Sequence, residues 1–303
     1  MKIFATVTVL TLGAVDAFQL MNSVSRVLAM RKQKTRDTST ETSYDVDSWR
    51  AGFSTCEEEI CTVLDGSVPL DIEGTYFRNG YGVFEIGSSK QPVLHPFDSD
   101  GMLCAAQFDK GKIFFRNRMI QTSGFQKEKG AEGALFRNAF GTQPKGFFKN
   151  LFKTEIKNVA NTNVIWFGNR LLALWEGGLP HLIEPDSLDT VGTYTIDGLI
   201  PEPLGQFSAH PRVDATTGRM VNFATTRTNT EAVLTVYEFG KDTMAVENRR
   251  TFTVPGFPFF HDFIVTENYY IFNQAPTGLL FVSTKLFLYL FLWFYLLCVI
   301  CYV

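Results

Sequence analysis

Two histidines stand in similar surroundings and could together hold a metal ion. His210 lies in the segment 207–214, FSAHPRVD, and His261 lies in the segment 258–263, PFFHDF. Each has an apolar or aromatic frame at the head of a strand-like run. Neutral imidazole nitrogens suit iron, zinc and copper as ligands. The alternative is a pair of buried histidines that bond backbone carbonyls, because two ligands alone do not make a metal site.

The spacing of these histidines fits a fold made of repeated sheets. They stand 51 residues apart, and one blade of a propeller takes about 40 to 50 residues. A radial fold would bring one histidine from each blade to a shared axis. The remaining histidines are His95, in the turn HPFD, and His181, after GGLP. We expect both of these to be structural.

The elements that must position these residues are mostly short strands between residues 69 and 274. β-Branched and aromatic runs alternate there with turn pairs. Gly168-Asn169, between Asn163–Phe167 and Arg170–Trp175, predicts a hairpin. The other expected strands are Lys112–Arg118, Arg219–Thr225, Val233–Phe239, Arg250–Val254, Phe263–Val265 and Tyr269–Phe272. Phe147–Lys157 is the best candidate for helical turns, and no other stretch shows strong helical periodicity. An all-β sandwich, barrel or propeller is therefore expected.

Composition excludes some classes of protein. The 303 residues are 45% apolar and 14% aromatic, which is ample for a core and unlike a disordered chain. A formal net charge of -3 gives no reason to expect a nucleic-acid partner. The five cysteines form neither a disulfide framework nor a zinc motif.

The N-terminal region is typical of a targeting sequence. Residues 1–17 have one lysine, an apolar run and a small-residue end, which predicts a signal peptide. Residues 18–45 begin with a basic, acid-free stretch to Arg36 that indicates a transit peptide. The Ala17-Phe18 junction resembles the bipartite presequence of algae with secondary plastids, so we expect a plastid location. The alternative is a secretory signal followed by a basic linker.

Several longer segments resemble, in family order, the carotenoid cleavage oxygenases, whose members include the retinal pigment epithelial membrane protein. SAHPRVD and FFHDFIVTENYYIF, around His210 and His261, resemble the first two metal-ligand motifs. NTNVIWFGNRLLALWEGGLPHL at 161–182, HPFDSDGMLCAAQF at 95–108 and GTYFRNG at 74–80 resemble further parts of the family pattern. The resemblance covers residues from about 68 to 274.

This resemblance implies a fold and a site. The family fold is a seven-bladed β-propeller, of which residues 46–276 would supply about the first half of the blades. Fe(II) on the axis is held by four histidines, and His210 and His261 match the first two. Glu176 matches a carboxylate that accepts the other ring N–H of a ligand, here expected to be His261. A ligating imidazole needs this partner because it fixes the tautomer.

The implied reaction is cleavage of a conjugated C=C bond of a carotenoid or apocarotenoid by O₂, giving two carbonyl products. The substrate is lipophilic, and we expect contact with a membrane surface. Gly146–Lys153, GFFKNLFK, is a candidate for that contact, although it could equally be a partly buried loop. Alternative functions are cleavage of a stilbene-type alkene and a non-catalytic fragment that binds carotenoid or membrane.

The sequence departs from the family pattern near Pro276. No histidine follows His261, so the third and fourth ligands would lie beyond Gln274 in a longer product. We therefore expect this chain as written not to turn over. Residues 286–303 carry no charge; this helix-like apolar tail is just long enough to span a membrane, or it is translated non-coding sequence.

Overall fold

The computed structural model describes residues 56–63, 65–150, 155–202, 205–227, 231–255, 259–274 and 297–302. The chain divides into two units, Met1–Gly52 and Phe53–Val303, and everything below concerns the second. The expected signal peptide (1–17) and transit segment (18–45) lie outside the described residues. So do residues 286–296 and 303 of the apolar tail.

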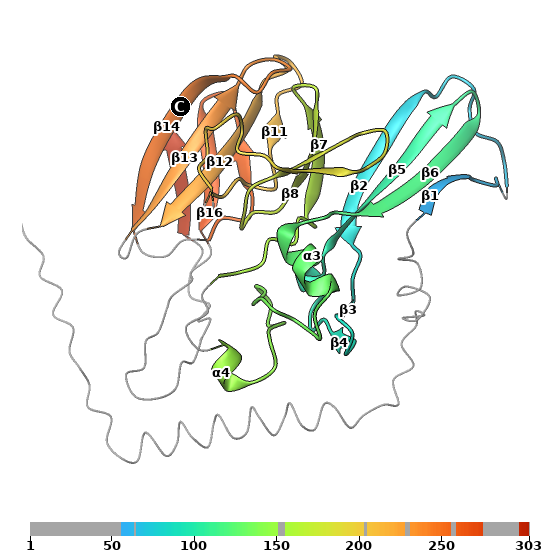
Figure 1. Ribbon diagram of the computed structural model, residues 1–303. Coiled ribbons are helices and arrows are strands. Elements are labelled where there is room, and N and C mark those ends of the chain that lie inside the picture. The colour runs from blue at the N-terminus through green and yellow to red at the C-terminus, as the bar shows by residue number, and fades with distance from the viewer. Residues whose placement is uncertain are drawn as a thin grey trace, which may run out of the picture. The chain divides into compact units, whose positions relative to one another are not determined.

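The described chain is mostly antiparallel sheet (Figure 1). Three sheets have four strands each, and a fourth has three. In sheet order the first is β1 (Cys56–Ile60), β6 (Lys112–Met119), β5 (Gly101–Asp109) and β2 (Gly74–Tyr81). The second is β10 (Thr190–Thr193), β9 (His181–Ile183), β8 (Arg170–Leu174) and β7 (Asn163–Phe167). The third is β11 (Arg212–Val213), β12 (Met220–Arg227), β13 (Glu231–Phe239) and β14 (Val246–Pro255). The fourth is β15 (Phe263–Val265), β16 (Tyr269–Gln274) and β17 (Leu297–Tyr302).

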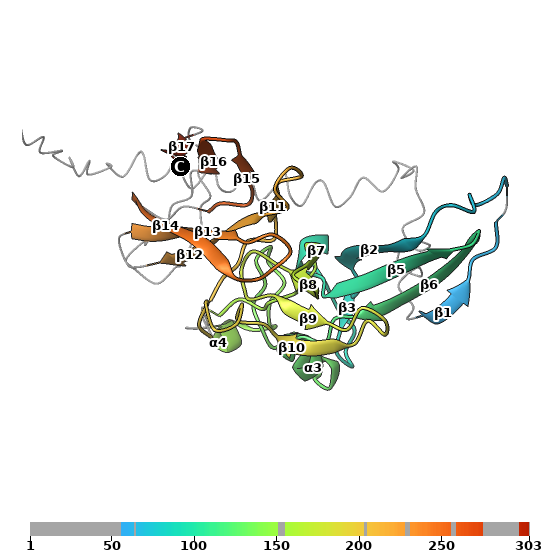
Figure 2. The same cartoon turned by 90° about the horizontal axis from the view of Figure 1, so that it is seen from above.

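Short elements connect these sheets. A two-stranded sheet is formed by β3 (Glu85–Ile86) and β4 (Gln91–Pro92), and a 3₁₀ turn by η1 (Pro96–Asp98). The helices are α3 (Ser123–Lys129) and α4 (Phe147–Asn150). Figure 2 shows the second, third and fourth sheets following one another from β9 to β16.

Apolar cores between consecutive sheets hold them in this order. Leu171 and Ala173 of β8 join the core that β5 of the first sheet also lines. Leu172 and Leu174, which point to the opposite face, join the core shared with the third sheet. The third sheet likewise contacts the fourth through Phe223 and its neighbours. A strand buried on both faces reads as a continuous apolar run, and four-stranded sheets stacked in this way are typical of propeller blades. The number of seven blades stays a prediction.

Most expected strands are present with bounds that differ by one or two residues. Gly168 and Asn169 both have φ of 56°, as the hairpin turn predicted from this pair requires. β14 begins at Val246, earlier than the expected Arg250. The residues after Val246, Glu247–Arg249, are polar, so their strand conformation depends on pairing with β13 and not on local propensity.

The helical turns expected within Phe147–Lys157 are present as one turn, α4, and residues 151–154 lie outside the described residues. Two other expectations are wrong: α3 was not expected, and the described end of the tail is not helical. The tail was expected to be helix-like, but Leu297–Tyr302 is strand β17, antiparallel to β16. Its β-branched and aromatic residues favour a strand, and pairing covers an edge of β16. In the described part of the chain no helix has the length and apolar character needed to cross a membrane.

Candidate metal centre

The fold brings His210 and His261 together. His210 precedes β11 of the third sheet, and His261 precedes β15 of the fourth. Their Nε2 atoms lie 3.1 Å apart. The rings are 4.5 Å apart between centroids, at an interplanar angle of 66°. The two Nε2 atoms therefore face one point in space from two different sheets.

Glu176 lies behind His261. It follows β8, and its Oε1 is 2.9 Å from Nδ1 of His261. Thr162 Oγ1 donates to the other carboxylate oxygen at 3.3 Å. A carboxylate accepts from Nδ1–H, so it favours the tautomer whose Nε2 carries the lone pair. The partner expected for Glu176 is the one that the structure provides.

This geometry fits a metal ion. Imidazole nitrogens bind metals such as zinc at about 2.0–2.1 Å. Two nitrogens 3.1 Å apart, each at such a distance, would subtend roughly 95–102° at the ion. Without an ion, the two Nε2 atoms can form a hydrogen bond with each other only if one of them carries a proton. Within the described residues no group of three or more His, Cys, Asp or Glu side chains converges, so the local donors are these two imidazoles.

Electrostatics distinguish the three side chains. The hydrogen bond to Glu176 raises the pKa of His261. Burial, followed by the neighbouring His261, lowers the pKa of His210. Burial alone would raise the pKa of Glu176, but hydrogen bonds, first that with His261, bring it below its ordinary value. Glu176 is therefore an anion at neutral pH, and His210 is neutral and available to a metal.

Asparagines hold the backbone before His210. Asn163 Nδ2 donates to Ala209 O at 2.7 Å, and Asn222 Nδ2 donates to Ser208 O at 2.9 Å. Neither residue was among the site residues expected from the sequence. A signal was present, because asparagine is depleted in strands and both residues lie in strands, β7 and β12.

The other two histidines have separate environments, as expected. His95 caps η1, accepting from Phe97 N at 3.1 Å, and its ring stacks on Phe140. His181 is buried in β9, and burial lowers its pKa to about 4. Neither contacts His210 or His261 in the described residues.

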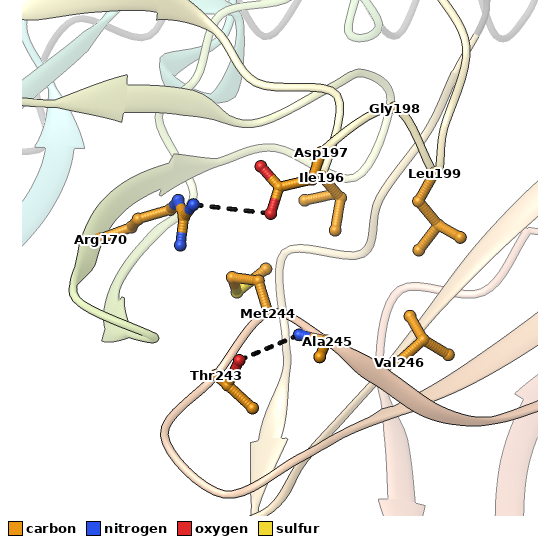
Figure 3. A pocket seen from close by; sticks show the side chains of 9 residues that line it. All are labelled: Arg170, Ile196, Asp197, Gly198, Leu199, Thr243, Met244, Ala245 and Val246. Carbon is orange, nitrogen blue, oxygen red and sulfur yellow. Dashed lines mark hydrogen bonds and ion pairs between the residues drawn. The ribbon is translucent and has the colours of Figure 1, made fainter.

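The structure also has a cavity of about 520 Å³ (Figure 3). Arg170, the turn Ile196–Leu199 and the segment Thr243–Val246 line it. Arg170 is engaged there by Asp197 at 3.5 Å and by the ring of Tyr194 at 5.3 Å. The cavity contains neither histidine of the centre, so we do not assign it to the same site.

Comparison with known proteins identifies the family. A family model described as retinal pigment epithelial membrane protein matches residues 52–289. The chain belongs to this carotenoid oxygenase family. Apocarotenoid-15,15'-oxygenase of Synechocystis is 39% identical over 243 residues, covering 77% of this chain and 49% of that protein. Isoeugenol monooxygenase of Pseudomonas putida is 33% identical over 220 residues, covering 70% of this chain and 43% of that protein.

A solved structure agrees with this assignment. Cobalt-substituted Synechocystis apocarotenoid oxygenase superposes with a TM-score of 0.68 at 38% identity, covering 78% of this chain and 50% of the other. The chain therefore spans about half the length of the relatives it matches.

Proposed function

We propose that this chain contributes His210, His261 and Glu176 to an iron(II) centre that cleaves a conjugated C=C bond of an apocarotenoid or carotenoid with O₂. One observation carries the proposal: the two imidazoles meet at their Nε2 atoms, and Glu176 holds Nδ1 of one of them. Membership of the carotenoid oxygenase family supports interpreting this arrangement as part of a metal centre.

Each residue of the chain has a defined task in this proposal. His210 and His261 would hold the iron through Nε2, while Glu176 keeps the proton of His261 on Nδ1. When bound, Fe(II) supplies the O₂ chemistry that side chains lack. Both oxygen atoms add across the double bond, which breaks to leave two carbonyl groups. No side chain is consumed, so the contribution of these three residues is the geometry of the ligands.

The relatives favour an apocarotenoid over a phenolic alkene as substrate. The apocarotenoid oxygenase is 39% identical to this chain, against 33% for the isoeugenol monooxygenase. A resveratrol cleavage oxygenase of Aspergillus fumigatus is also similar, at 29%. Cleavage of a stilbene-type alkene is therefore the second candidate function, and the assay below tests it separately.

The test is metal loading followed by product analysis. The purified chain is incubated with Fe(II), O₂ and either an apocarotenal or resveratrol, and aldehydes are measured by chromatography and mass spectrometry. Aldehyde that disappears in His261→Ala would support the proposal and contradict the expectation that this chain does not turn over. Metal binding without product would favour the non-catalytic alternative. Failure of the chain to bind Fe(II) would contradict the proposal that His210 and His261 form a metal centre.

A plastid location is a separate proposal. It rests on the signal-like residues 1–17 and the basic segment that follows. A fluorescent protein fused to residues 1–45 and expressed in an alga with secondary plastids should enter the plastid. Retention in the secretory pathway would support the alternative location.

A further inference from the structure

We propose that Arg212 and Asp262 form a clamp between two sheets that sets the separation of His210 and His261. Both would be positioning residues for the metal centre. This inference rests on the function proposed above, because the clamp matters only if the two imidazoles share a metal.

The positions of the pair in the chain are the first observation. Arg212 stands two residues after His210 and opens β11. Asp262 directly follows His261 and precedes β15. A contact between these two residues therefore joins the third sheet to the fourth immediately beside the imidazoles.

The contact itself constrains orientation as well as distance. Arg212 Nη2 lies 2.6 and 2.5 Å from the two carboxylate oxygens of Asp262. Arg212 Nε also donates to Phe263 O at 3.1 Å. Asp262 Oδ1 accepts from the main-chain N–H of Phe263 at 2.7 Å. The guanidinium thus binds both a side chain and the backbone of the neighbouring sheet, which a lysine could not reproduce.

Within the described residues, few polar contacts join the two histidine-bearing segments. Those between 208–213 and 259–265 are this ion pair, its bond to Phe263 O and the contact of the imidazoles themselves. Apolar packing around Phe223 holds the sheets together, but such packing is non-directional. The clamp provides the directional contact next to the imidazoles.

The ion pair of Arg212 and Asp262 is half-exposed. Its exposure allows an experiment to distinguish a positioning role from a role in overall stability. The side chains of Arg212 and Asp262 are 45% and 42% exposed. Exposed ion pairs contribute little to overall stability. Removing this pair should therefore leave the melting temperature nearly unchanged while altering the centre.

The direct effect of each charge on metal affinity differs from the effect of losing the clamp at one of the two residues. Loss of the Arg212 cation would favour a nearby divalent ion, and loss of the Asp262 anion would disfavour it. A clamp predicts weaker metal binding in both cases. Arg212→Ala is therefore the decisive variant, because the two explanations differ in sign there.

The experiment is titration of the full chain with Co(II), followed by calorimetry and visible absorption at one pH. The variants are Arg212→Ala, Asp262→Ala and their double variant. Arg219→Ala is the matched control, since its ion pair with Glu247 has similar exposure, 47% and 43%, but lies within the third sheet. Arg212→Lys keeps the charge and loses the bond to Phe263 O, and it replaces Arg212→Ala if that variant does not fold.

We expect each single variant to bind Co(II) about 10- to 100-fold more weakly, the range typical for lost partners of metal ligands. The double variant should be no weaker than the singles, and the control should match the wild type. Wild-type affinity or tighter binding in Arg212→Ala, or equal weakening in Arg219→Ala, would overturn the clamp. If the wild type binds no better than His210→Ala, the metal centre and the clamp both fall.

Discussion

At the scale of single residues, Glu176 is the hydrogen-bond partner of His261, one of the two proposed metal ligands. It is 16% exposed and bonds Nδ1 of His261 at 2.9 Å. Replacing its charged oxygen by an amide retains an acceptor but weakens the bond. The imidazole would then be a poorer donor to the metal.

We expect Glu176→Gln to weaken Co(II) binding by about tenfold or more. Titration calorimetry would measure the change. Thr162→Val is the control, since it removes the 3.3 Å bond to Glu176 and the 3.2 Å contact with Asn161 but leaves the bond between Glu176 and Nδ1 of His261 in place. It should have a smaller effect. Equal affinity in Glu176→Gln and the wild type would show that Nδ1 of His261 does not depend on this carboxylate.

His181 should make the fold sensitive to acid. Burial lowers its pKa from 6.5 to about 4, so between these values the unfolded chain binds a proton that the folded chain does not. Its contribution to stability is complete above pH 6.5 and is lost as the pH falls toward 4. A difference of this size corresponds to about 3 kcal/mol.

We expect His181→Phe to remove this loss of stability. Urea unfolding of both proteins between pH 4 and 7 would measure the difference. Asp100, whose pKa burial raises to about 6, has the opposite pH dependence over part of this range. It is present in both proteins and cancels in the comparison. Parallel pH profiles of wild type and variant would refute the role of His181.

At the scale of elements, a buried ionic cluster joins α3 to the segment that leads into β7. Lys157 Nζ lies 2.6 Å from Asp100 and 2.6 Å from Glu128, and all three side chains are nearly fully buried. Val159 O accepts from Gly101 N, and Asn161 donates to Ser99 O. These contacts hold the segment that delivers Thr162 to Glu176.

We expect Lys157→Met to destabilise the protein by about 3–5 kcal/mol, because it leaves two buried carboxylates without a cation. Urea unfolding at pH 7 would measure this change. Asp100→Asn keeps the pair of Lys157 with Glu128 and should cost clearly less. A Lys157→Met protein as stable as Asp100→Asn would contradict this account of the cluster.

At the scale of the whole molecule, surface residues around α4 could meet a lipid surface. Phe148 is 86% exposed, and Lys145 and Lys149 beside it are exposed as well. Exposed aromatic and basic side chains together are typical of interfacial membrane contact. The patch predicted over Gly146–Lys153 is described through Asn150, and residues 151–154 lie outside the described residues.

We expect Phe147→Ser with Phe148→Ser to weaken binding to anionic liposomes by about tenfold or more, since burial of even one phenylalanine provides roughly 1.5–3 kcal/mol. Sedimentation with liposomes would measure the bound fraction. Tyr76→Ser is the control, because Tyr76 is 62% exposed on β2, outside the patch. Unchanged binding in the double variant would reject the membrane contact.

The sequence determined the local elements and the residues that the family motifs mark. The hairpin at Gly168-Asn169 follows from two residues that tolerate positive φ, and the strands follow from local composition. Polar strand residues such as Glu247–Arg249 of β14, and the apolar residues of β17, were assigned less well. Their conformation depends on pairing with another strand.

Only the tertiary structure decided how the site is assembled. Glu176 and His261 are 85 residues apart, and Arg212 and Asp262 are 50 apart. Contacts over such separations depend on how whole sheets stack, which local propensity does not encode. The motifs thus named His210, His261 and Glu176, while the packing of sheets revealed the supporting contacts of Asn163, Asn222, Arg212 and Asp262.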